Sequence, residues 1–577
     1  MLGDRWICDR VPTERFPDYT RGNAGEVLAE PVSPLAWTFC WEPGPVQGCV
    51  DGFEQMGTWD RAEYGDPPES FGLFGGYFYN SLTQSRIFGI RSGAGWQAID
   101  DAFFDGASQE IPAYVAADWH ESECNSKKLM ATMGWLTTAD GFPEAELQKR
   151  EAKAVRDSRP DLASQTDDQL VARAFSLQRH LRVQFSSVVW AAMGASVPTG
   201  ILPALLGEVE PDAISKLITG IGDVDSADIA GRIFVLSRAV RASDELTAAF
   251  DGDLDGLLDR LGESSSTDVT SFLADVEEFM YVHGGRGPNE WDVYQWSYET
   301  NPTLLLQAIE RARHAPDSAD PVEQNAKSAA ERRRLIEKYE GVFAGNEEAL
   351  GAFQTAVKTA QVWMAARERI KSSNIRCHHE VRMCFGELGR RMVERGHLAH
   401  DRQIYMLLAD ELDDFMADPA SFSDRLTERE SDYLSLYDLQ PPYIVNGEVP
   451  PLSEWAQRGS DEVATVSVGD SLSGVAGSPG TATGTARVLL DLSDPTRLEP
   501  GDILIAPSTD PSWTPLFLVA DAVITDIGAV GTHAVIVSRE LGIPCVPSIA
   551  DATRRIPDGA TITVDGSLGT VTIDALP

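Results

Sequence analysis

A short segment near the C-terminus constrains the fold of this chain more than any other. It begins with the apolar run Ala522-Val-Ile524, continues through a loop that contains Gly528 and Gly531, and ends in the stretch Ala534 to Leu541. The apolar run predicts a buried strand, and the last stretch predicts a helix that stops at Gly542-Ile-Pro544. The order of strand, glycine loop and helix indicates a compact β/α unit.

His533 lies where this loop meets the predicted helix. Free N–H groups and the helix dipole favour an anion such as phosphate at that end of a helix. An imidazole nitrogen is nucleophilic near neutral pH, so this ring can carry a phosphoryl group as a covalent intermediate. Thr532 is positioned to cap the helix and steady the ring. The alternative is a core histidine in a Rossmann-like helix.

The residues around His533 also form a recognisable pattern, Gly528-x-x-x-Thr-His-Ala-x-Ile-Val-x-Arg539-Glu-x-Gly-Ile-Pro544. It resembles the swivelling phosphohistidine domain of the PEP-utilising enzymes, a group that includes PEP synthase, pyruvate phosphate dikinase, rifampicin phosphotransferase and phenylphosphate synthase. One departure is Ala529, where the family usually has a second glycine. The resemblance implies that His533 carries the phosphoryl group and that Gly528, Gly531, Thr532 and Arg539 shape its loop. Flanking segments fit the same family: Gly477-Ser-Pro-Gly480, Gly501-Asp-Ile-Leu504, Thr509-Asp-Pro511 and Val564-Asp-Gly566.

Length and composition set limits on the rest of the chain. With 577 residues, it has room for two to four domains. The formal charge of −41 argues against nucleic acid or an anionic membrane as a partner, because both need positive surface. Seven cysteines, odd in number and irregularly spaced, favour a reduced cytoplasm over a disulfide framework. The N-terminus has no basic-then-apolar signal pattern, so we expect a cytoplasmic protein.

The pattern changes along the chain predict an α+β multidomain protein. Residues 1–111, rich in Gly, Pro and aromatic residues, are expected to form loops and short strands at the start of a substrate domain. Residues 112–445 predict a mostly helical substrate-binding domain. The polar stretch 446–470 is expected to be a linker that lets the next domain move. Residues 471–577 predict the compact β/α swivelling phosphohistidine domain.

A second resemblance covers the N-terminal and central parts. Thr20-Arg-Gly-Asn23-Ala-Gly-Glu26, with Pro31-x-Ser-Pro34 after it, looks like the opening of the substrate-binding domain in rifampicin-phosphotransferase-like proteins. His283-Gly-Gly-Arg286-Gly-Pro-Asn-Glu290-Trp-Asp292 and Arg367-Glu-x-x-Lys371 follow in the family's order. The resemblance implies a helical domain that holds a hydroxyl-bearing acceptor.

Two cations of this pattern are candidates for the transfer step. Arg367 and Lys371 are four residues apart, so on a helix both face the same way. They could hold a transferring phosphoryl group and offset its charge in the transition state. The alternative is an exposed pair in which the neighbouring Glu368 balances the charge.

The glycine-rich segment supplies candidate bases. It is expected to follow a helix that ends at Met280. His283 or Glu290 could accept the hydroxyl proton of the acceptor, with Arg286 as a binding residue. The alternative is that Arg286 and Glu290 pair to pin a turn. Asn23 and Glu26 are substrate-binding candidates by the same logic, although an Arg-Gly-Asn loop is often simply a turn.

Two other patterns are open to more than one interpretation. The apolar stretch Phe185–Leu206, with Pro198 and Pro203, predicts a buried helix pair joined by a turn rather than a membrane span. Its aromatic residues pack in a core or line an apolar pocket. Cys377, two histidines and Cys384 lack the spacing of a zinc site, so no metal site is predicted on this chain.

The sequence shows no ATP-grasp domain, no Gly-x-x-x-x-Gly-Lys loop and no barrel for PEP. We therefore expect a phosphotransferase component whose His533 is phosphorylated by a separate ATP-grasp protein. ATP would be the indirect donor, with Mg²⁺ on that partner, and a small apolar alcohol or phenol the acceptor. Alternatives are a phosphocarrier subunit that relays phosphate to another protein, or a non-catalytic relative.

Overall fold

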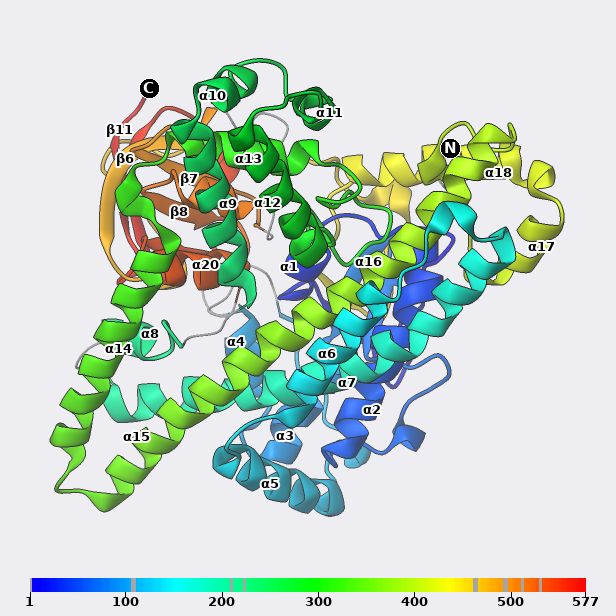
Figure 1. Cartoon of the computed structure of the whole chain (residues 1–577). Coiled ribbons are helices and arrows are strands. Elements are labelled where there is room, and N and C mark those ends of the chain that lie inside the picture. The colour runs from blue at the N-terminus through cyan, green and yellow to red at the C-terminus, as the bar shows by residue number, and fades with distance from the viewer. Residues whose placement is uncertain are drawn as a thin grey trace. The chain divides into compact units, whose positions relative to one another are not determined.

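The computed structural model describes residues 3–104, 111–207, 211–221, 225–459, 465–490, 497–509, 513–528 and 532–577. The chain forms two compact units, each built from separate segments (Figure 1). Unit 1 comprises Met1–Ala195, Asn289–Gln295 and Val362–Glu462, and unit 2 comprises Ser196–Pro288, Trp296–Gln361 and Val463–Pro577.

Unit 1 combines a small antiparallel sheet with long helices. The sheet has the strand order β2-β3-β1-β4. Its edge strand β4, near residue 445, pairs with β1 from the N-terminal part of the chain. Residues 1–111 were expected to be loops and short strands, but they also form several helices, because their aromatic side chains enter the core. Buried Trp37, Trp41 and Trp59 belong to that core. The main elements are β1 (Asp18–Thr20), β2 (Phe71–Phe74), β3 (Tyr77–Ser81), β4 (Ile444–Asn446), α1 (Ala24–Val27), η1 (Ala36–Val46), α2 (Gln47–Gln55), α3 (Leu82–Ser92), α4 (Gln97–Phe104), α5 (Glu123–Thr138), α6 (Pro143–Asp157), α16 (Ala365–Glu394), α17 (Leu412–Ala417) and α18 (Ser423–Ser435).

Helix α7 (Asp167–Leu206) runs from unit 1 into unit 2 and corrects one expectation. The stretch 185–206 is not a helix pair joined by a turn. It belongs to a single helix of 40 residues that contains both Pro198 and Pro203. By length and composition, α7 is the one helix of the described residues that could cross a membrane, and 33% of its apolar window is buried within the protein.

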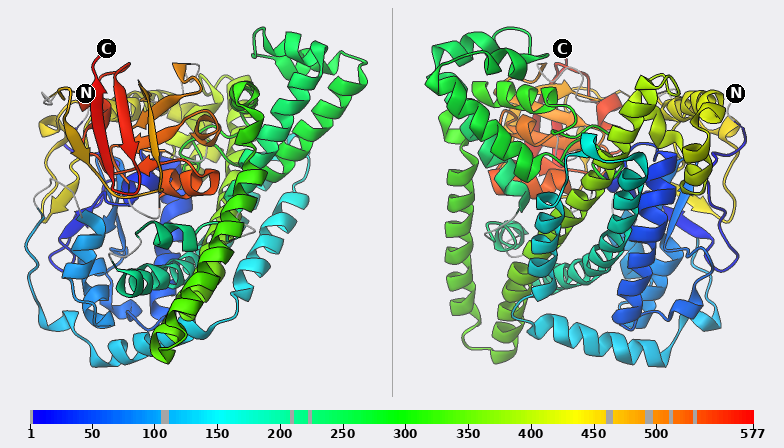
Figure 2. Two further views of the ribbon diagram at one scale, coloured as in Figure 1. Left: turned by 90° about the vertical axis from the view of Figure 1, so that its left-hand side faces the viewer. Right: turned by 45° about the vertical axis from the view of Figure 1, so that its right-hand side comes forward.

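Unit 2 contains a seven-stranded mixed sheet, orange to red in Figure 1, with the order β5-β11-β10-β6-β7-β8-β9. The strands β6, β7, β8 and β9 are parallel, and β5, β10 and β11 are antiparallel to their neighbours. Figure 2 shows these strands from two further sides. The strands are β5 (Ser471–Ser473), β6 (Thr481–Val488), β7 (Asp502–Ala506), β8 (Ala522–Thr525), β9 (Cys545–Val546), β10 (Thr561–Asp565) and β11 (Thr570–Ala575).

Helices cover both faces of this sheet, and the strand sequences show why. Along β7, Ile503 and Ile505 face one hydrophobic cluster, whereas Leu504 faces another, as the two-residue period of a strand requires. The Leu504 cluster includes α19 (Thr514–Phe517), α20 (His533–Leu541), α9 (Asp225–Ala242), α12 (Thr267–His283) and α13 (Thr303–His314). The opposite cluster includes α21 (Ala552–Arg555). The other helices of unit 2 are α8 (Pro211–Leu217), α10 (Asp244–Phe250), α11 (Leu257–Gly262), α14 (Pro321–Phe343) and α15 (Glu347–Thr359).

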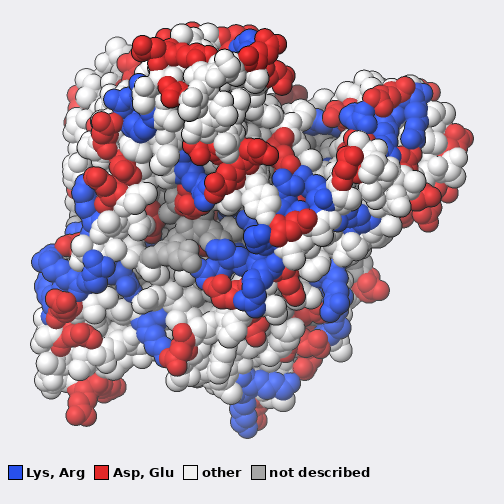
Figure 3. Space-filling view, in the orientation of Figure 1, with Lys and Arg blue, Asp and Glu red and all other residues white. Residues whose placement is uncertain are grey.

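The fold class of the sequence analysis is confirmed, since a helical part precedes a C-terminal β/α part. The compact units nevertheless cut across the expected helical domain of residues 112–445. Residues 196–288 and 296–361 group with the C-terminal sheet, and apolar residues between Ile229 and Ala315 share a hydrophobic core with it. On the face shown in Figure 3, acidic side chains are scattered among basic ones rather than gathered in one field.

Candidate functional site

His533 is the first residue of α20, directly after the loop that follows β8. All four residues of β8 are buried, which is typical of a central parallel strand. Helix α20 ends at Gly542, which adopts the left-handed conformation with φ 71°. The predicted strand and helix are therefore confirmed, and the imidazole ring is attached to the N-terminal turn of a helix.

Two threonine hydroxyls hold the His533 ring. Thr509 Oγ1 lies 3.0 Å from Nδ1, and Thr514 Oγ1 lies 3.2 Å from Nε2. The ring of Phe517 meets the imidazole edge-on, with 5.8 Å between centroids. In neutral histidine one ring nitrogen donates and the other accepts, and a hydroxyl can play either role, so the two threonines hold the orientation of the ring in both tautomers. The sequence analysis missed Thr514, which follows the flanking Thr509-Asp-Pro511 motif by only three residues.

The other loop residues have mainly structural contacts. Thr532 occupies the N-cap position, but its side chain makes no capping hydrogen bond. Its buried hydroxyl has no hydrogen-bond partner among the described residues, so the predicted cap is wrong. Arg539 donates from Nε to the Gly477 carbonyl at 2.8 Å, and burial lowers its pKa to about 10. At Gly528 a Cβ would come within 2.6 Å of Pro547 Cβ, which explains the glycine. Gly531 lies outside the described residues.

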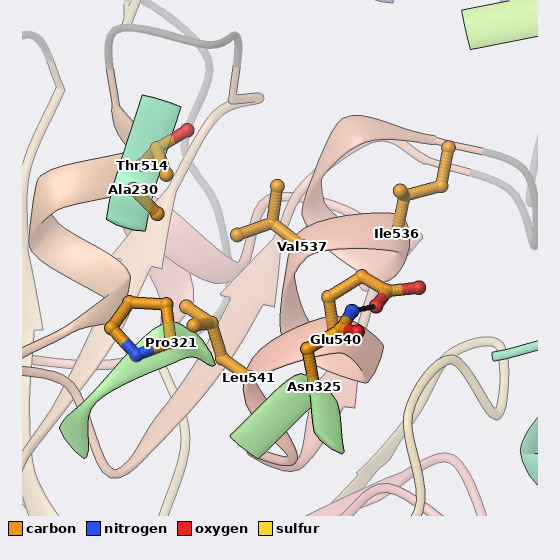
Figure 4. Close-up of a pocket in the computed structure, with 8 residues that line it drawn as sticks. All are labelled: Ala230, Pro321, Asn325, Thr514, Ile536, Val537, Glu540 and Leu541. Carbon is orange, nitrogen blue, oxygen red and sulfur yellow. Dashed lines mark hydrogen bonds between the residues drawn. The ribbon is translucent and has the colours of Figure 1, made fainter. Parts of the chain in front are cut away.

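A small cavity of about 20 Å³ lies beside α20, the helix that His533 begins (Figure 4). Thr514, which contacts His533 Nε2, also lines this cavity. Glu540 and Asn325 meet at its edge through a hydrogen bond from the Asn325 side-chain amide. The volume is close to that of one water, so the cavity does not accommodate a phosphoryl group without movement of its walls. The remaining lining residues are Ala230, Pro321, Ile536, Val537 and Leu541.

The second candidate in unit 2 is His283. Helix α12 extends to His283 instead of ending at Met280, so the histidine forms its last residue. Its Nε2 lies 2.8 Å from Asp228 Oδ2 on α9. Desolvation lowers the pKa of His283, and the Asp228 hydrogen bond opposes that effect. Asp228 was not predicted, although its spacing of four residues from Arg232 on a helix was visible in the sequence.

Unit 1 brings together two candidates from distant motifs. Lys371 Nζ lies 3.8 Å from Glu290 Oε1, and the Glu290 side chain is only 2% exposed. Arg367 and Lys371 both belong to α16, as predicted from their spacing. Arg367 Nη1 is 3.9 Å from Glu368 Oε1, so the balancing contact with Glu368 is also present.

The N-terminal motif contacts the same segment. Asp292 accepts hydrogen bonds from the backbone N–H and the hydroxyl of Ser33, both at 2.7 Å. Burial raises the pKa of the Asp292 carboxyl. Asn23 lies just before α1 in a left-handed conformation with φ 59°, without a capping bond, and Glu26 belongs to α1. The left-handed backbone conformation of Asn23 agrees with a turn role for this residue.

The candidate residues are therefore divided between the units. His533, His283, Arg286, Gly528, Thr532 and Arg539 belong to unit 2, whereas Asn23, Glu26, Glu290, Arg367 and Lys371 belong to unit 1. Among the described residues no group of three or more His, Cys, Asp or Glu side chains could hold a metal ion.

Two segments of the chain match known protein families. Residues 498–569 match the mobile domain of PEP-utilising enzymes, and residues 184–368 match the fourth domain of rifampicin phosphotransferase. The chain is therefore similar, in these two segments, to rifampicin phosphotransferase and to the PEP-utilising enzymes. His533 thus lies in the segment that matches the family's mobile domain, and His283, Glu290 and Arg367 lie in the segment that matches the fourth domain.

Three similar proteins align with 62% to 64% of the chain. The chain is 30% identical over 369 residues to an uncharacterized protein of Mycobacterium bovis, an alignment that spans 62% of this chain and 39% of that protein. It is 28% identical over 370 residues to a rifampicin phosphotransferase of a Streptomyces species (62% and 41%). It is 27% identical over 381 residues to an uncharacterized phosphotransferase of Bacillus subtilis (64% and 44%). The chain thus spans well under two thirds of the length of these relatives.

Proposed function

We propose that this protein is a phosphotransferase component of the PEP-utilising enzyme family that carries a phosphoryl group on His533 and passes it to a hydroxyl of a small molecule. The observation that supports this most is the mounting of His533. The ring lies at a helix N-terminus, and Thr509 and Thr514 contact its two nitrogens at 3.0 and 3.2 Å. A nucleophilic ring held in one orientation is what a covalent phosphoryl carrier needs.

The second half-reaction transfers the group to the acceptor. The acceptor oxygen forms a bond to phosphorus, the P–N bond breaks, and its electron pair returns to His533. Arg367 and Lys371 offset negative charge on the moving phosphoryl group, and His283 or Glu290 takes the hydroxyl proton. Asn23, Glu26 and Arg286 bind the acceptor in this scheme.

The acceptor is an apolar alcohol or phenol. Its support is an aromatic cluster in unit 1 that includes Trp363, which precedes Arg367 by four residues. Trp135 lies 5.5 Å from Trp190 and 5.6 Å from Trp363, centroid to centroid, and it is 43% exposed. Aromatic side chains with open faces favour apolar ligands. A relative with a similar sequence bears the name of an antibiotic phosphotransferase, which fits a bulky hydroxyl-bearing acceptor.

The donor side is assigned to a second protein. An ATP-grasp partner, with Mg²⁺ and ATP bound to it, phosphorylates His533, and both proteins are cytoplasmic. Mg²⁺ on such a partner would neutralise phosphate charge during nucleotide cleavage. The residues of this chain supply the nucleophile and the ring-holding threonines.

The test is intact-mass and acid-lability analysis of the wild-type protein and two variants, His533→Ala and the exposed control His314→Ala. Each is incubated with ATP or PEP, with and without a candidate ATP-grasp protein. An acid-labile phosphoryl adduct on the wild type and His314→Ala, present only with the partner and lost in His533→Ala, supports the proposal. An adduct without the partner refutes the separate-donor assignment. No adduct on His533 under any condition refutes the carrier role.

A further inference from the structure

The His283–Asp228 pair has the geometry of a base and the group that orients it. The pair joins the last residue of α12 to the first turns of α9, with 2.8 Å between Nε2 and Oδ2. His283 is 7% exposed, and Phe279 packs its ring against the imidazole at 5.2 Å between centroids. Among the described residues Asp228 is the only hydrogen-bond partner of the His283 ring.

Charged neighbours hold Asp228 ionised and in place. Arg232, one turn along α9, donates from Nε to Asp228 Oδ2 at 3.0 Å, and its Nη1 contacts Glu278 at 3.1 Å. The hydrogen bond from His283, with the charge of Arg232, lowers the pKa of Asp228. A carboxylate near the N-terminus of α9 is further favoured by the helix dipole.

A charged Asp228 fixes the tautomer of His283. The carboxylate can only accept, so the proton of the neutral ring resides on Nε2, and the lone pair is left on Nδ1. Three charged groups shift the pKa of the His283 ring, namely Asp228, Arg232 and Arg286. Burial and the positive charge of Arg286 lower the pKa of His283, which keeps the ring neutral near pH 7 and able to accept a proton.

We propose that His283 Nδ1 is the general base for the acceptor hydroxyl and that Asp228 is its positioning residue. This inference rests on the proposed function and chooses between the two bases considered there. As the acceptor oxygen bonds to phosphorus, its O–H bond breaks and the proton moves to Nδ1. The P–N bond to His533 breaks at the same time, and its electron pair stays on the His533 ring. The resulting His283 imidazolium is stabilised by Asp228, and the proton then leaves to solvent.

A purely structural contact would behave differently. The side chain of Asp228 is half exposed, and its removal would leave the buried ring in its packing against Phe279. A structural role therefore predicts altered stability but an unchanged rate of transfer in the folded protein. A positioning role predicts a slower transfer and a changed pKa of His283.

The experiment compares Asp228→Asn, Asp228→Glu and His283→Gln with the control Asp275→Asn. Asp275 is an exposed carboxylate on α12, so its variant makes the same change of charge on the same pair of helices. The full-length protein is phosphorylated on His533 with phosphoramidate, which needs no partner protein, and then mixed with phenol as the probe acceptor. Phenyl phosphate and remaining phosphohistidine are followed with time, and the His283 ring is titrated by NMR.

We expect His283→Gln to slow transfer about 100-fold, the low end for a general base, and Asp228→Asn to slow it about 10-fold. Asp228→Glu should restore part of the rate, and Asp275→Asn should match the wild type. The pKa of His283 should fall in Asp228→Asn and stay constant in Asp275→Asn. An unchanged transfer rate in Asp228→Asn, or an unchanged His283 titration, overturns the inference while leaving the carrier role intact. A protein that never phosphorylates on His533 fails at the earlier step, which refutes the proposed function and this inference with it.

Discussion

The two threonines on the His533 ring lead to a pair of predictions with opposite signs. Thr509→Val and Thr514→Val each remove one hydroxyl while nearly preserving shape, so each abolishes one contact, to Nδ1 or to Nε2. We predict that the phosphoryl group is added to Nε2, because this nitrogen is farther from the backbone and less hindered. Thr514 then competes for the reacting lone pair, whereas Thr509 orients the ring.

The size of both effects follows from one hydrogen bond. A neutral hydrogen bond contributes about 0.5–1.5 kcal/mol, which corresponds to a factor of about 2 to 13 in a population at 25 °C. Thr514→Val should therefore speed phosphorylation by about that factor, because the Nε2 lone pair no longer has to break a contact first. Thr509→Val should slow phosphorylation by a similar factor, because the reactive orientation of the ring is less populated.

The assay uses phosphoramidate as the donor, with His533→Ala as the background for the other histidines of the chain. Rates come from mass analysis of the peptide that contains His533, and ³¹P NMR distinguishes the Nδ1 from the Nε2 adduct. An Nδ1 adduct, or a slower Thr514→Val combined with a faster Thr509→Val, would refute the assignment of the two threonines.

Three further predictions concern other groups. Lys371→Met should slow transfer to phenol about 10-fold or more, because it removes a cation that lies 3.8 Å from the buried Glu290 carboxylate. It should leave the rate of His533 phosphorylation unchanged. The exposed control Lys327→Met should change neither rate. Burial raises the pKa of Asp526 to about 6 from 3.8, so the folded protein binds the proton more tightly and this group's contribution to stability falls as pH rises from about 4 to 6. The melting temperature of Asp526→Asn relative to wild type should therefore rise over that interval, by the equivalent of up to about 3 kcal/mol, and a pH-independent difference would contradict this. Gly528→Ala should lower the melting temperature by the equivalent of about 1–3 kcal/mol, since its Cβ would overlap the neighbouring proline, and an unchanged value would show that the loop can shift.

The chain's local patterns were sufficient to predict the C-terminal elements. The run from Ala522 to Ile524 is a buried strand, and the helix from His533 ends at Gly542, because hydrophobic period and glycine conformational freedom act over a few residues. The spacing of Arg367 and Lys371 likewise predicted that both lie on one helix. Patterns of this kind depend on neighbours in the chain, so they are readable without the tertiary structure.

Local patterns failed where packing outweighs propensity. The prolines at 198 and 203 predicted a break, yet α7 continues through both. Thr532 has a residue type suited to capping, but its hydroxyl does not cap the helix. Aromatic residues in the first hundred positions favoured loops in the sequence analysis, whereas burial of Trp37 and Trp41 accompanies a helical turn there. In each case contacts with distant segments, invisible in the sequence, decide the local conformation.

The sequence by itself determined the identity of the phosphoryl-carrier candidate, because the residues around His533 are contiguous and their chemistry is local. Only the tertiary structure revealed three side-chain contacts. Thr514 contacts His533, Asp228 contacts His283, and Glu290 contacts Lys371. These side chains are separated by 19, 55 and 81 positions. Hydrogen bonds and ion pairs act over a few ångströms in space, so the fold must first bring such residues together before they can act as one site.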